Sequence, residues 1–187
     1  MSGQELAFRH YSDYDGLWRT AIRALSQDKY GYIWIGADAG LKRFDGISIR
    51  SFHTSDDKSV QSVSALLDMG DSLLVGTDDG AYVLDYKSET THCLNLTAKK
   101  GRHKNIHVSS LAADKDNNVW ISTMGHGIYQ YDTASGTIRN IDFGIDNRVA
   151  QVFVDSSNQI WALTAWNPNG GVFLYDKVKR RFEVYKL

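Results

Sequence analysis

A unit of about 41 residues recurs four times in this chain and limits the folds that it can adopt. The first unit, from Ile22 to Gly46, reads IRALSQDKYGYIWIGADAGLKRFDG. Its short apolar-alternating runs, separated by Gly and Asp turns, predict successive antiparallel strands. The four units begin at Ile22, Val63, Val108 and Val149, which lie 41, 45 and 41 positions apart. A four-stranded unit with this period is typical of a propeller blade.

Spacings inside the units support the repeat. In units one, three and four, the first apolar residue lies 12 positions before a Trp, whereas Val63 lies 11 positions before Leu74. Each third strand runs five positions from a Gly to an Asp, namely Gly40/Asp45, Gly80/Asp85, Gly127/Asp132 and Gly171/Asp176. We therefore predict one all-β domain over residues 1–187, a partial or small β-propeller of four four-stranded antiparallel blades. The expected segments are a lead-in strand at 6–11 and blades at about 21–53, 63–96, 108–142 and 149–186.

Composition excludes several partners and says little about others. The net charge of −1 gives no reason to expect nucleic acid or an acidic membrane surface. No stretch reaches the roughly 20 apolar residues that span a bilayer, so we expect no membrane contact by this segment. A single cysteine, Cys93, forbids an intrachain disulfide. The abundance of Trp, Tyr and Phe fits many half-buried strands.

The repeat resembles a known family. The pattern Ile-x-x-Leu-x-x-Asp, then Gly-x-Ile-Trp-Ile-Gly, then Gly-Leu-x-Arg-Phe-Asp-Gly is similar to the two-component regulator propeller repeat. The lead-in Phe8-Arg9-His10-Tyr11-Ser12 is similar to the opening of periplasmic sensor regions in Bacteroides-type hybrid two-component systems. The second unit departs from the pattern, because Leu74 replaces the Trp and the turn 68–71 is shortened.

The resemblance implies a non-catalytic, extracytoplasmic sensor module that binds glycan breakdown products. It places the segment in the periplasm, as part of an inner-membrane sensor, although a cytoplasmic location stays open. Any kinase activity would lie in domains outside these 187 residues. Family sensors usually have many more blades, so the chain resembles a fragment or a truncated relative.

The repeated residues are best interpreted as structural. Trp34, Trp120 and Trp161 recur at one register, which favours packing between adjacent blades over carbohydrate stacking. The Asp residues that end first and third strands are predicted to cap turns with their side chains. Asp114–Asn118 superficially resembles a calcium loop, but Val119 stands where such a loop needs Gly.

Residues that break the repeat are the better functional candidates. Loops between blades and loops joining strands two and three share one face of a propeller, and a ligand would contact them there. Unit four has an insertion in such a loop, since Trp161 lies 10 positions before Gly171 while Trp34 lies six before Gly40. An inserted Trp suggests a binding platform, and a tucked loop anchor is an equal alternative. The candidate ligand-binding residues are Trp166, Asn167, Trp18, His126, Asp38, Asp79, Arg102 and Arg148.

Catalytic and metal motifs are not evident. His103 and His107 have the spacing of a metal pair only on a helix, and their polar setting favours a loop. We therefore predict no metal, no cofactor and no catalytic residue. Two other classes stay open, a propeller lyase acting on a polysaccharide or cyclic ester and a pure protein-interaction scaffold. The lyase would need His126 and a second His or carboxylate to converge in a pocket.

Open ends suggest association. Unit four already ends in its own outer strand, so the lead-in strand has no vacant outer position in these four blades. An open row of blades would expose apolar faces on its first and last sheets, which seek partners. We therefore expect a homodimer through open blade edges, and the resemblance implies an oligosaccharide ligand.

Overall fold

A computed structural model describes residues 9–12, 15–17, 20–52, 62–96, 106–141, 143, 147–164 and 170–185. These residues form sixteen strands in four sheets, each a four-stranded antiparallel meander, which confirms the predicted fold class. The first sheet holds β1 (Ile22–Gln27), β2 (Ile33–Ala37), β3 (Gly40–Phe44) and β4 (Ile49–Ser51), and the second holds β5 (Val63–Asp68), β6 (Ser72–Thr77), β7 (Gly80–Asp85) and β8 (Thr91–Leu94). The third holds β9 (Val108–Ala113), β10 (Asn118–Thr123), β11 (Ile128–Asp132) and β12 (Ile138–Ile141), and the fourth holds β13 (Val149–Val154), β14 (Ile160–Thr164), β15 (Val172–Asp176) and β16 (Arg181–Val184).

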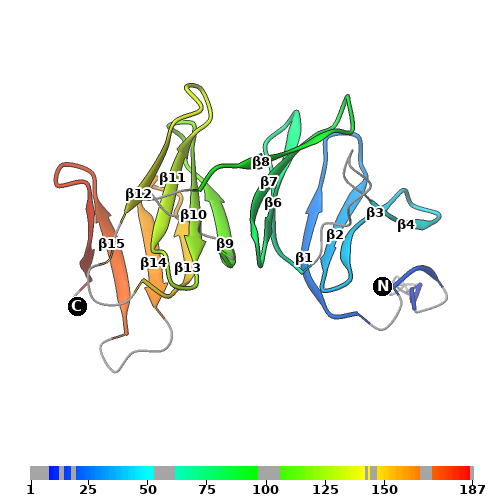
Figure 1. Ribbon diagram of the computed structural model, residues 1–187, viewed down its shortest axis with the longest axis horizontal. Coiled ribbons are helices and arrows are strands. Elements are labelled where there is room, and N and C mark those ends of the chain that lie inside the picture. The colour runs from blue at the N-terminus through cyan, green and yellow to red at the C-terminus, as the bar shows by residue number, and fades with distance from the viewer. Residues whose placement is uncertain are drawn as a thin grey trace, which may run out of the picture.

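The four sheets follow one another as blades in chain order. The first strands of neighbouring sheets pack together, β1 with β5, β5 with β9 and β9 with β13. Among the described residues, β13 does not pack against β1 as closely as these neighbouring first strands pack together. The sheets therefore form an open row. Figure 1 shows β3 and β4 at one end of the row and β15 at the other. The first and fourth sheets therefore each keep one face without a neighbouring sheet.

Apolar side chains fill the space between each pair of sheets. Between sheets one and two, Trp34 and Leu41 meet Val63 and Leu73. Between sheets three and four, Trp120 packs with Val149, Val152, Ile160 and Tyr175. Sheets two and three meet in the same way through Leu74, Val83, Val108, Val119, Ile121 and Tyr129. Because every interface uses residues of two units, no unit buries its apolar face alone.

Small residues allow the blades to approach near their first strands. A Cβ on Gly36 would lie 2.6 Å from Cγ1 of Val63, and one on Gly76 would lie 2.5 Å from Cγ1 of Val108. The third blade has the buried Ser122 at this position of the repeat. The fourth has Leu163, which is 41% exposed. The three blades that are followed by another sheet therefore have Gly or Ser at this position.

An Asp side chain organises the turn between the first two strands of three blades. The carboxylate of Asp114 accepts the backbone N–H groups of Asp116 and Asn118 at 2.8 and 2.9 Å. It also accepts the indole Nε1–H of Trp120 at 2.9 Å. Asp28 with Trp34 and Asp155 with Trp161 repeat the arrangement. The predicted turn role is confirmed, and the same carboxylate also anchors the tryptophan.

The second blade compensates for its missing Trp. Its turn is one residue shorter, and Gly70 takes a φ of 86°, a left-handed conformation that suits glycine. The hydroxyl of Tyr86 donates to Asp68 at 2.8 Å, in place of an indole N–H. The Tyr86 ring stacks on Trp34 of the preceding blade, with 6.0 Å between ring centroids. Burial and the bond to Asp68 raise the pKa of the Tyr86 hydroxyl.

The Asp residues that end third strands cap the next turn, as predicted. Asp45 accepts the backbone N–H groups of Ile47 and Ser48 at 2.9 and 2.7 Å. Asp85, Asp132 and Asp176 accept two N–H groups each in the same way. The bond from the Ser48 N–H, followed by that from Ile47, lowers the pKa of Asp45 from 3.8 to about 2. The pKa values of the other three carboxyls are lowered for the same reason.

These carboxyls predict loss of stability in acid. A carboxyl with a pKa lower in the folded chain than in the unfolded chain stabilises the fold above its ordinary value of 3.8. That contribution disappears as the pH falls from there through the folded value of about 2. In Asp45→Asn, which keeps an acceptor oxygen, the urea midpoint should fall less steeply over this window than in wild type. Tryptophan fluorescence would measure the midpoints, and identical slopes would refute the assignment.

Two predictions about burial and the lead-in strand need correction. Trp34 and Trp120 are buried between sheets as predicted, 2% and 1% exposed. Trp161 is only half-buried, because its side of the fourth sheet has no following sheet. In the predicted lead-in strand at 6–11, residues 9–11 form no strand and 6–8 lie outside the described residues. Tyr11 instead packs its ring on Phe44, with 4.9 Å between centroids.

The uncovered side of the fourth sheet is apolar. Phe153, Trp161, Leu163, Val172 and Leu174 lie on this side by their strand register. Phe153, Leu163 and Val172 are each more than 40% exposed. Apolar faces of this kind mark surfaces that associate. The homodimer through open blade edges stays a prediction.

Candidate functional site

The end of the blades expected to bind ligand carries a cavity of about 550 Å³ along the first strands. Its lining comes from all four blades: Ile22, Arg23, Asp38, Ser62, Ser64, Asp78, His107, Ser109, Met124 and Ala150. We call it the axial cavity. Arg23 forms a two-bond ion pair with Asp38 inside the first blade. His107 Nδ1 lies 3.2 Å from a carboxylate oxygen of Asp78, which joins the third blade to the second.

Hydroxyl groups at the axial cavity tie neighbouring blades together. Ser64 Oγ donates to the carbonyl of Val108 at 2.6 Å. Ser109 Oγ donates likewise to the carbonyl of Val149. These bonds join β5 to β9 and β9 to β13 along one wall of the cavity. Its mixed charges and hydroxyls suit a polar ligand.

The structure separates the predicted site residues that it describes. Asp38 lines the axial cavity. Asp79 lines another cavity, of about 270 Å³, together with Cys93 and Asn95. His126 lies in the loop that follows β10. Arg148 lies beside that loop, where it forms an isolated β-bridge with Met124. Trp166, Asn167, Trp18 and Arg102 lie outside the described residues, so their placement stays a prediction.

Backbone hydrogen bonds hold the loop that carries His126. The His126 N–H donates to Thr123 Oγ1 at 3.1 Å, and its carbonyl accepts from Asn140 Nδ2 at 2.7 Å. Gly125 and Gly127 both donate to the carbonyl of Asn147. The loop is therefore tied to the connection that enters the fourth blade. Its half-buried histidine does not line the axial cavity.

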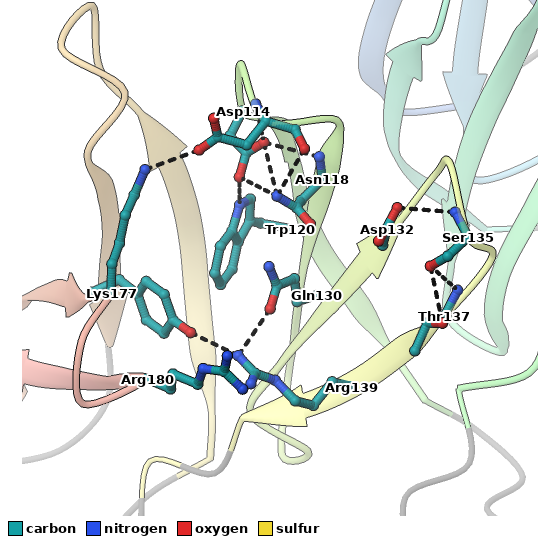
Figure 2. A pocket seen from close by; sticks show the side chains of 12 residues that line it. Asp114, Asn118, Trp120, Gln130, Asp132, Ser135, Thr137, Arg139, Lys177 and Arg180 are labelled. Carbon is teal, nitrogen blue, oxygen red and sulfur yellow. Dashed lines mark hydrogen bonds and ion pairs between the residues drawn. The ribbon is translucent and has the colours of Figure 1, made fainter.

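A second candidate site lies at the opposite end of the blades, where the sequence prediction placed none. It is a cavity of about 410 Å³ between the third and fourth sheets, which we call groove 3/4 (Figure 2). Asp114 and Trp120 lie at one end, and Arg139 and Arg180 are directed into the other. The remaining lining residues are Asp116, Asn118, Gln130, Asp132, Ser135, Thr137, Tyr175 and Lys177.

An equivalent cavity of about 220 Å³, groove 1/2, lies between the first and second sheets. It is largely aromatic, with Tyr30, Tyr32, Trp34, Phe52 and Tyr86 in its lining. Arg43 lies over the rings of Tyr32 and Trp34, at 4.7 and 5.5 Å from their centroids. The sequence prediction missed these grooves because it did not compare the blades at the turn and fourth strand that follow each third strand. The residue types there differ from blade to blade.

No group of three or more His, Cys, Asp or Glu side chains among the described residues is placed to hold a metal ion. No helix in that part of the chain is long and apolar enough to cross a membrane.

Known proteins share the repeat. Residues 16–39 and 102–125 match the model of the two component regulator propeller family. These stretches cover the first two strands of blades one and three, and the first of them contains part of the motif described above. A 52-residue segment is 31% identical to histidine kinase P4 of Formosa agariphila and covers 28% of this chain and 4% of the kinase.

Solved structures share the fold. The extracellular domain of a putative hybrid two component system from B. thetaiotaomicron is similar over 90% of this chain, with a TM-score of 0.72 and 22% identity. A catalytically inactive virginiamycin B lyase from Staphylococcus aureus is similar over 90% of the chain, with a TM-score of 0.68 and 14% identity. The chain spans 22% of the first protein and 56% of the second. At these identities the likeness establishes a propeller fold.

Proposed function

We propose that the chain is a non-catalytic ligand-binding propeller module of a two-component signalling protein. The observation that carries the proposal is the match of two separate blades to the two component regulator propeller model. The likeness to an extracellular domain of a hybrid two component system supports an extracytoplasmic, periplasmic location. Glycan breakdown products are the proposed ligands.

The geometry offers a physical route from binding to signalling. Four blades contribute to the axial cavity, and hydroxyl bonds and the His107–Asp78 pair join the blades there. A ligand that contacts two blades at once would favour one relative position of those blades. Its binding energy would then favour one arrangement of any domain that is joined to the row of blades. Any kinase step belongs to other domains of such a protein.

A lyase is the second candidate, favoured by the likeness to virginiamycin B lyase and by His126 in a loop of the expected face. The described loop brings His126 near Asn147 and Arg148, but not into the axial cavity with Asp38 and His107. A base and its partner must lie within hydrogen-bond reach of a reacting group. Loss of a ring-opening or lyase activity in His126→Ala would support this candidate over the sensor.

The sensor proposal predicts oligosaccharide binding through the loop inserted in the fourth blade. Oligosaccharides from degraded glycans should change tryptophan fluorescence saturably, because ligand would contact Trp166. Trp166→Ala should weaken binding at least tenfold, since stacking on an aromatic ring is lost. Trp161→Phe is the control, because that ring lies on the sheet and not in the loop. Equal affinity of Trp166→Ala and wild type would remove the platform, and no binding by wild type would oppose the proposed ligand class.

A further inference from the structure

Groove 3/4 and groove 1/2 occupy the same place in the repeat but carry different charges. Counting from the Asp that ends the third strand, Glu89 and Arg180 occupy one equivalent position, four residues on. Both adopt a left-handed backbone, with φ of 53° and 55°. By sheet register, Arg139 of the third blade pairs with Gln130 and corresponds to Arg50 of the first blade, which pairs with Arg43 and does not line groove 1/2. Glu89 and Arg180 line their grooves at matching positions, and Arg139 lines groove 3/4.

The cation of groove 1/2 is neutralised within the groove. Arg43 Nη1 donates to Glu89 Oε1 at 2.8 Å, across the boundary between the two blades. Groove 3/4 lacks both partners of this pair, since Gln130 stands at the position of Arg43 and Arg180 at the position of Glu89. A second guanidinium, that of Arg139, lines groove 3/4, whereas its register equivalent Arg50 does not line groove 1/2. The lining of groove 3/4 therefore has two guanidinium groups where that of groove 1/2 has one Arg–Glu ion pair.

Arg139 has only neutral oxygens as hydrogen-bond acceptors in the described part of the chain. Its Nη2 donates to Gln130 Oε1 at 2.9 Å and to the Tyr175 hydroxyl at 2.7 Å. No carboxylate of the described residues lies within ion-pair distance of its guanidinium. These two bonds hold the half-buried side chain in place (Figure 2). A fixed guanidinium without a carboxylate partner favours an anion, which planar guanidinium groups bind with two parallel hydrogen bonds.

Three acidic residues of groove 3/4 accept hydrogen bonds from neighbouring groups of the chain. Asp114 accepts from Asp116, Asn118 and Trp120. Asp116 binds Lys177 at 3.0 Å and Asn158 at 3.0 Å. Asp132 accepts two turn N–H groups through Oδ1. Asp132, Ser135 and Thr137 line the groove along the β11–β12 hairpin and supply oxygen atoms that can accept from ligand hydroxyls.

We propose that groove 3/4 binds a small polyhydroxylated carboxylate. The carboxylate lies against Arg139 and Arg180, and the hydroxyls lie toward Asp132, Ser135 and Thr137. The volume of about 410 Å³ falls within the range of small-molecule sites, about 300–1,000 Å³. This site lies at the opposite end of the blades from the loops of the proposed function, and its occupancy does not depend on that function.

Isothermal titration of the whole chain with gluconate tests the proposal, with sorbitol as the matched ligand that lacks only the carboxylate. Gluconate should bind saturably, and sorbitol at least tenfold more weakly. Arg139→Gln should weaken gluconate binding at least tenfold, because the fixed cation is lost. Arg180→Glu copies the charge found in groove 1/2 and should also reduce binding at least tenfold. Added salt should weaken gluconate binding more than sorbitol binding.

Controls separate a ligand site from a structural role. Arg43→Gln makes the same change in groove 1/2 and should leave gluconate affinity unaltered. Arg180 is exposed, so Arg180→Glu keeps the test valid if Arg139→Gln loosens the packing against Tyr175. Urea midpoints of all variants give the fold readout. Absence of saturable gluconate binding, equal affinity for sorbitol, or full affinity in folded Arg180→Glu would each overturn the proposal.

Discussion

Replacing Trp120 with alanine is expected to lower the free energy of unfolding by about 3–5 kcal/mol, the usual cost of removing a buried Trp. The indole is 1% exposed and fills the interface between the third and fourth sheets. Its ring contacts Tyr175 edge-on, with 4.7 Å between centroids. The substitution would leave a cavity there and remove the N–H that binds Asp114. Urea denaturation followed by circular dichroism measures the change.

Two further variants separate the causes of this loss. Trp120→Phe keeps most of the apolar volume but removes the indole bond to Asp114, so it should cost less than the alanine variant. Trp161→Ala makes the same change on the uncovered side of the fourth sheet, where the ring is half-buried. It should cost clearly less than Trp120→Ala. Equal losses at both tryptophans would mean that the blade interfaces are wrongly assigned.

Gly76→Ala is expected to destabilise the chain by about 1–3 kcal/mol through overpacking. The added Cβ would lie 2.5 Å from Cγ1 and 3.0 Å from Cβ of Val108, which is fully buried on the next blade. The neighbouring blades would have to separate to accommodate the methyl group. Because β5 and β9 are also joined by the Ser64 hydroxyl bond, this separation strains the axial end of both blades. Urea midpoints measure the loss.

Leu163→Ala provides the control at the equivalent position of the fourth blade. Leu163 is exposed and has no following sheet, so shortening it should change stability by about 0.5 kcal/mol or less. A large loss there, or no loss for Gly76→Ala, would contradict the comparison of blades.

Leu163 also affects how another sheet could pack against the fourth. Another sheet cannot approach the fourth at the spacing of the other interfaces unless Leu163 moves, because Gly36, Gly76 and Ser122 are smaller there.

The blades and their turns could be predicted from local sequence patterns. Period-two alternation and turn residues are local properties, so strands such as β2 and β10 could be predicted to within a residue or two. The Asp turns followed in the same way, because Asp45 and its equivalents bond backbone groups only two and three residues away. The burial of Trp34 and Trp120 followed from their recurrence at one register. Each of these features depends on neighbours inside one unit or on its repetition.

The residues that meet between blades could be identified only from the packing of the sheets. Trp161 stands at the same repeat position as Trp120, yet it is half-buried, because exposure depends on whether a sheet follows. Groove 3/4 joins Arg139 of one blade to Tyr175 of the next, 36 positions along the chain. The distance between such residues is set by the twist and packing of two sheets. The alternation of apolar and polar residues along one strand does not depend on that distance. The groove therefore could not be predicted from the repeat.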